Sequence, residues 1–147
     1  MKGFRFRLEP VLTLRVWEEE RARTTYTQAL RQEARFIEAL KAVDARIEEA
    51  VAQWRREAST QGPAAARALW MRHLLGLDRE RNDTAQKIVS ARRIREQKMK
   101  LLIDAHQRVR VLETLKSKRQ QAQQAETRRH EERELDEIVS ARFQPDL

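Results

Sequence analysis

Cysteine is absent from this chain of 147 residues, and glycine and proline occur only three times each. Without cysteine there is no disulfide framework and no thiol chemistry. So few glycines and prolines leave few places where the chain can reverse direction. No apolar run approaches the roughly 20 residues that span a bilayer, and basic residues interrupt the opening eight residues, unlike a signal peptide. We therefore expect a cytosolic protein, with peripheral association with a membrane left open.

Charge is what the sequence has in abundance. Charged residues make up 37% of the chain and its formal net charge is +8. Apolar residues recur at helical spacing through most of the length, which favours long helices or a coiled coil over disorder. The positive charge favours an acidic partner, such as an acidic protein surface, anionic lipid or nucleic acid. It is equally consistent with a long coil whose solvated faces are simply basic.

One segment is typical of a chain reversal. Gly62-Pro63 is the only Gly-Pro pair, and it follows Ser59, Thr60 and Gln61. Glycine suits the end of a helix and proline suits the start of the next one. The sequence predicts one helix over about 9–58, a bend over about 59–63 and a second helix over about 64–142. The expected fold is all-α: a single domain over residues 1–147, formed by a long antiparallel coiled-coil hairpin.

The seam of each helix can be counted at alternating spacings of three and four residues, which is the coiled-coil pattern. In the first helix it comprises Leu12, Val16, Glu19, Arg23, Tyr26, Leu30, Glu33, Ile37, Leu40, Asp44, Ile47, Val51, Trp54 and Ala58. In the second it comprises Trp70, Leu74, Leu77, Arg81, Thr84, Ile88, Ala91, Arg95, Lys98, Leu102, Ala105, Val109 and Leu112. The polar positions lower stability and select a register or a partner.

The two predicted helices differ in length. Folding the chain about Gln61 pairs residue x with about 122 − x, which sets Pro10 opposite Leu112. The chain from about Lys118 onward then overhangs the hairpin. A polar spacer over 118–134 leads to an apolar tip at Leu135, Ile138 and Val139. The overhang is either a frayed end or an end that docks into a partner.

A second apolar cluster lies beside the predicted bend. Its members are Trp54, Leu69, Trp70, Met71, Leu74, Leu75 and Leu77. One seam cannot bury all of them, and exposed apolar residues gathered in one place mark interaction surfaces. The alternative is a wider local core in which these side chains close over the turn.

Catalysis finds little support in the sequence. The three histidines, His73, His106 and His130, are far apart, and none has a partner at metal-ligand spacing. There is no glycine-rich phosphate loop. We expect no enzyme activity, no cofactor, no metal and no small-molecule ligand.

Nucleic acid is a weaker alternative partner. The basic residues involved are Arg92, Arg93, Arg95, Lys98, Lys100, Arg108, Arg110, Lys116, Lys118 and Arg119. Such a group favours phosphate contacts. These residues are spread around the helix, however, and no aromatic residues interleave with them for base stacking. We therefore expect no nucleic acid as partner.

The opening of the chain resembles a known family. Phe4, Phe6 and Leu8 alternate with other residues, Val11, Leu12, Leu14 and Arg15 follow, and then comes the segment 18–22. With the length, the two long helices, the bend near residue 62 and the charged C-terminal extension, this resembles the bacterial flagellar export protein family FliJ. The related proteins of injectisome-type secretion have the same plan. A generic coiled-coil scaffold stays open as an alternative.

The resemblance implies a function in flagellum assembly and therefore in motility and chemotaxis. Members of this family are stalk proteins without catalytic residues. They insert into the hexameric ring of the export ATPase, promote its assembly and activity, contact the export gate protein FlhA and escort export chaperones. By resemblance, the ATPase-ring residues are Phe4, Phe6, Leu8, Leu12, Arg119, Arg128, Arg129, Leu135 and Ile138. The export-gate residues are Ile47, Val51, Trp54, Trp70, Met71, Leu74, Leu75 and Leu77.

Overall fold

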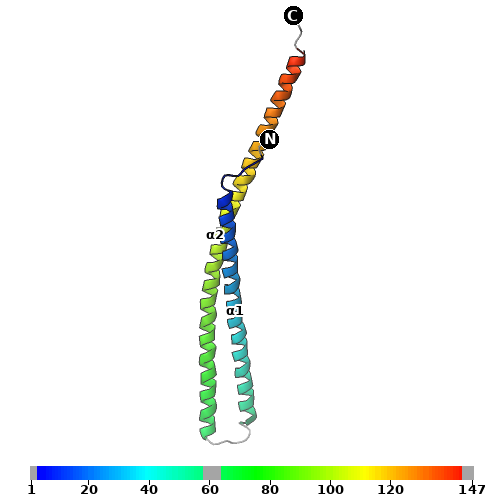
Figure 1. The fold of residues 1–147 in the computed structure, drawn as a ribbon. Coiled ribbons are helices and arrows are strands. Elements are labelled where there is room, and N and C mark those ends of the chain that lie inside the picture. The colour runs from blue at the N-terminus through cyan, green and yellow to red at the C-terminus, as the bar shows by residue number, and fades with distance from the viewer. Residues whose placement is uncertain (1–2, 58–63, 144–147) are drawn as a thin grey trace. The chain divides into compact units, whose positions relative to one another are not determined.

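Two long helices make up almost all of the structure. The computed structural model describes residues 3–57 and 64–143. Helix α1 spans Glu9–Glu57 and helix α2 spans Ala64–Phe143, against expected bounds of about 9–58 and 64–142. The helices pack against each other, and the described residues contain no strand (Figure 1). The all-α hairpin fold is thereby confirmed. The predicted bend over 59–63, with Gly62-Pro63, lies outside the described residues.

The contacts group the chain into two compact units. Unit 1 comprises Met1–Glu20 with Ile103–Leu147, and unit 2 comprises Arg21–Leu102. In each unit a stretch of α1 lies beside a stretch of α2. Each unit can therefore be described by the residues that its two stretches bury and by the ion pairs between them.

The seam of α2 is confirmed by burial. Leu77, Thr84, Ile88, Ala91 and Val109 are buried, and the remaining predicted seam positions of α2 are at least half-buried. The Thr84 hydroxyl is satisfied because it donates to the backbone carbonyl of Glu80 at 2.8 Å. A polar residue can therefore occupy this seam at little cost.

Several alternate positions of the α1 seam, among them Leu30, Asp44 and Val51, were predicted one residue too late. Ala29 is 8% exposed whereas Leu30 is 40% exposed, and Val43 and Ala50 are buried in place of Asp44 and Val51. The prediction followed the larger side chains. The structure instead turns small residues inward, because they let two long helices approach closely while the large neighbours lie at the edges of the seam.

Ion pairs between the two helices show the register of the hairpin in unit 2. Arg81 Nε contacts Asp44 Oδ1 at 2.7 Å, and Arg46 Nη1 contacts Glu80 Oε1 at 2.9 Å. Residue numbers of these partners add to about 125, not the 122 expected from a fold about Gln61. The expected register would have set Asp44 near Asp78, and like charges repel. A shift of three residues brings each carboxylate to a cation.

Unit 1 shows the same register. Lys116 Nζ lies 2.9 Å from Glu9 Oε2, and His106 Nδ1 lies 3.1 Å from Glu19 Oε1. In the expected register, Glu9 would have faced Glu113. In both units the residue numbers of the partners therefore add to about 125. Since α1 begins at Glu9, the part of α2 beyond Lys116 has no helix of α1 beside it.

The start of α1 is held by the apolar core of unit 1. Glu9 N donates to Phe6 O at 3.1 Å, and Leu12 N donates to Leu8 O at 2.9 Å. Pro10 sits in the first turn, where its missing N–H is not needed. Phe6, Leu12 and Val109 form the buried cluster, and Phe4, Leu8, Leu112 and Leu115 pack against it. The segment 3–8 therefore extends the packing beyond the first turn of α1.

Candidate binding surfaces

The expected ATPase-ring residues fall into two groups. Phe6 and Leu12 are buried, and Phe4 and Leu8 pack on the same cluster, so these four support the fold of unit 1. The Arg119 guanidinium lies 5.9 Å from the centre of the Phe6 ring, at a distance where a cation is attracted to the ring face. Apart from that ring contact, Arg119 is exposed, and so are the other four, Arg128, Arg129, Leu135 and Ile138.

The C-terminal segment, residues 118–143 of α2, is the least covered part of unit 1. Every residue in it except Gln123 is exposed. Leu135, Ile138, Val139 and Phe143 are 50–80% exposed, and they recur at spacings that put them on one side of the helix. An exposed apolar stripe at the end of a polar helix is the kind of surface that binds another protein.

The expected export-gate residues form a partly buried cluster in unit 2. Leu77 is buried, and Ile47, Val51, Trp70 and Leu74 are half-buried. Trp70 Nε1 donates to Glu57 Oε2 at 3.3 Å, which ties the two helices together. The exposed members are Trp54, Met71 and Leu75, and Leu69 is exposed beside them. The buried members thus form a wider local core, and the use of the exposed members as a contact surface stays a prediction.

One acidic side chain organises the middle of unit 2. Glu33 is largely buried; it accepts a hydrogen bond from Arg95 Nε, and its other carboxylate oxygen lies 3.7 Å from Arg92 Nε. The pKa of Arg95 is raised above its ordinary value, first because Glu33 accepts its hydrogen bond and attracts its charge, and further by contact with Tyr26. The guanidinium therefore stays charged at any physiological pH. These contacts favour one register of α1 along α2, because the carboxylate at position 33 pairs with both arginines.

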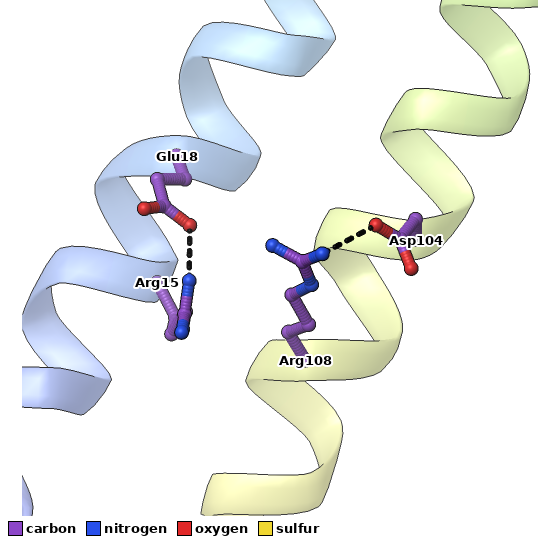
Figure 2. A network of polar contacts seen from close by, with 4 residues as sticks. All are labelled: Arg15, Glu18, Asp104 and Arg108. Atoms are coloured by element: carbon purple, nitrogen blue, oxygen red, sulfur yellow. Dashed lines mark hydrogen bonds and ion pairs between the residues drawn. The ribbon is translucent and has the colours of Figure 1, made fainter.

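In both helices, arginines contact carboxylates of their own helix, and Arg108 is the example from the basic stretch. In unit 1, Arg108 Nη2 lies 3.1 Å from Asp104 Oδ2, and Arg15 Nη1 lies 3.0 Å from Glu18 Oε2. Figure 2 shows the Arg108 side chain extending from α2 towards α1 while it contacts Asp104. Pairs of this kind reduce the free positive charge that a phosphate backbone would use.

A groove in unit 2 was missed by sequence reasoning. It has a volume of about 530 Å³, and its lining includes Ala29, Phe36, Asp83, Lys87, Ala91 and Ile94. Both alanines are buried, one on each helix, and their small side chains fill little of the space between the helices. Ala91 was predicted as a seam residue, but Ala29 was not, because the prediction favoured the larger Leu30 beside it.

The described residues offer no metal centre and no membrane span. Among them, no group of three or more His, Cys, Asp or Glu side chains has the geometry to hold a metal ion. His106 and His130 each contact a single carboxylate, Glu19 and Glu134. No helix over these residues is long and apolar enough to cross a bilayer.

These features define a class: an all-α protein of two antiparallel helices, with a narrow seam of alanines, aliphatic residues and ion pairs, and with apolar surface at two separate places. The family model described as Flagellar FliJ protein matches residues 4–146. The chain belongs to the FliJ family and is a component of flagellar type III protein export. No match was found among curated proteins, and none among solved structures.

Proposed function

We propose that this chain is a non-enzymatic stalk and coupling component of flagellar export, which inserts its C-terminal segment into the ring of the export ATPase hexamer. The observation that carries this proposal is the C-terminal segment itself. It is the stretch of α2 that extends beyond α1 within unit 1, and it carries an exposed apolar stripe at Leu135, Ile138, Val139 and Phe143. A helix that extends beyond its paired stretch can reach into the centre of a ring, and its apolar end supplies binding energy there.

A test uses stimulation of ATP hydrolysis by the purified export ATPase. Leu135→Ala combined with Ile138→Ala should reduce stimulation about tenfold or more, because two exposed apolar side chains would each lose about 1 kcal/mol or more of contact. The matched control is Val111→Ala, which also truncates an exposed residue of α2 in unit 1 but lies in the paired stretch. If the double variant stimulates as well as the unchanged protein, the C-terminal segment is not the docking end.

The exposed members of the cluster in unit 2 are proposed to contact the export gate protein FlhA. Met71 and Leu75 are exposed one turn apart on α2, and Trp54 of α1 is exposed in the same unit. Met71→Ala with Leu75→Ala should weaken binding to the gate's cytoplasmic part and leave helicity unchanged. The measurement is a binding titration with circular dichroism on the same samples. A large loss of helicity would instead assign these residues to the core.

Escort of export chaperones and a cytoplasmic location at the inner face of the membrane complete the proposal. Both rest on membership of the FliJ family, and the positive charge of the chain favours acidic protein partners. A pull-down from native cytosol with the ATPase, gate and chaperones identified is the measurement that tests them together. Recovery of none of these proteins would contradict the proposal.

A further inference from the structure

Charge divides the C-terminal segment into two halves of opposite sign. Residues 118–129 contain four cations and one carboxylate, whereas residues 131–137 contain five carboxylates and one cation. Both halves are exposed on a continuous helix. The only ion pair that the structure gives within these described residues joins His130 to Glu134. A helix with this pattern is complementary to a copy of itself that runs in the opposite direction.

The seam that contains Leu135 and Val139 of the apolar tip has the same symmetry. Starting from Leu135, spacings of three and four residues give the positions 118, 121, 125, 128, 132, 135, 139 and 142. This set is unchanged when the numbering is reversed about residue 130. Two antiparallel copies can therefore bring the same seam together from both sides, which is the requirement for a two-fold symmetric contact.

In such an antiparallel pair, each seam residue of one copy faces a seam residue of the other, and these facing residues, here called layers, are complementary in size and charge. Leu135 faces Ala125 of the second copy, and Glu132 faces Arg128 of the second copy, each layer occurring twice. Val139 lies opposite the aliphatic stem of Gln121 of the second copy. The one like-charged layer, Lys118 against Arg142, falls at the two ends, where water and salt screen it. A parallel pair would instead set Arg128 against Arg128 and Glu132 against Glu132.

The same chemistry already joins the two helices of unit 2. There, Arg81 contacts Asp44 at 2.7 Å across the antiparallel pair, and Arg95 contacts Glu33. Small seam residues such as Ala29 and Ala91 are buried. We propose that two copies of this chain associate through an antiparallel pairing of residues 118–143. If the proposed function holds, this pairing covers the docking end, so the ATPase ring and the second copy compete for it.

The experiment is sedimentation equilibrium of the purified full-length chain without any partner, over roughly 10 µM to 1 mM, the range suited to a small interface. The unchanged protein should show an average mass that rises with concentration. Arg128→Glu and Glu132→Arg each create two like-charged layers, and each alone should weaken association about tenfold or more. The double variant R128E/E132R restores opposite charges and should associate as the unchanged protein does.

Mixing the two single variants supplies a further arm. In a mixed pair, the two glutamates of one copy face the two arginines of the other, so the mixture should associate although neither variant does alone. Arg133→Glu is the matched control, because it makes the same change of charge off the seam and should leave association unaltered. Circular dichroism of each variant checks that helicity is retained.

Two results would overturn the proposal. One is an unchanged protein that stays monomeric over the whole concentration range. The other is association of both single variants as strong as that of the unchanged protein, which would place the contact elsewhere. Since no ATPase is present, either result leaves the proposed docking into the ring untouched, and the loss of ATPase stimulation by L135A/I138A tests that docking separately.

Discussion

Two leucines of α2, two residues apart, should respond very differently to the same substitution. Leu77 is 3% exposed and Leu75 is 53% exposed, and both were expected to contact the export gate. Truncation of a buried leucine to alanine costs about 2–5 kcal/mol in globular cores. We expect about 2–3 kcal/mol for Leu77→Ala, because a seam between two helices is open to water at both edges and part of the cavity will fill.

Leu75→Ala is the matched control for this prediction. Half of its side chain is already in water, so the lost burial is about 1 kcal/mol or less, and the higher helix propensity of alanine offsets part of that loss. The two variants should therefore differ by about 2 kcal/mol in the free energy of unfolding, from the values in the two preceding estimates.

The assay is urea unfolding followed by circular dichroism at 222 nm, with the slope of the transition compared between variants. A lower midpoint for Leu77→Ala with an unchanged slope would support the burial argument. Equal losses for the two variants, or a larger loss for Leu75→Ala, would refute the seam of α2 as described.

Two further predictions concern the seam and its charges. Ala29→Leu should destabilise the protein by about 1–3 kcal/mol, because a large side chain does not fit between closely packed helices. Leu30→Ala should cost less than about 1 kcal/mol, because Leu30 lies at the edge of the seam. Thermal unfolding of both variants measures this difference, and the reverse order would show that Leu30 is the seam residue. A double-mutant cycle of Asp44→Ala and Arg81→Ala should give a coupling of about 0.2–1 kcal/mol, since both side chains are partly exposed. Repeating the cycle at about 1 M salt should reduce that coupling, and a coupling that persists unchanged would indicate a contact other than an ion pair.

Prediction from sequence succeeded where periodicity carried the information. The seam of α2 was predicted correctly because Leu77 and Val109 have no large apolar residue directly beside them in the sequence. In α1, large residues flank small ones, and the pattern alone favours Leu30 over Ala29. In the structure the smaller residue of the two is the buried one, because two helices in contact need small residues at the points of closest approach.

Among the residues of the candidate surfaces, too, some positions were predicted from the sequence and others were not. The exposed tip at Leu135 and Ile138 was predicted from the lack of a partner opposite it. The burial of Leu12 was predicted from its seam position, whereas the packing of Phe6 into the core of unit 1 was not, because an alternating segment ahead of a helix carries no signal of what it will cover. Whether an apolar residue binds a partner or supports the fold is decided by its neighbours in space.

The sequence by itself determined that the chain forms two unequal helices and that the longer one overhangs. These follow from spacing and composition, which are local. Only the tertiary structure decided the register, because shifting the helices by three residues leaves every apolar spacing intact while it exchanges repulsion for attraction at Glu9 and Asp44. Charges far apart in the sequence meet only once the helices are side by side, and their pairing selects one of several seams that the apolar pattern allows.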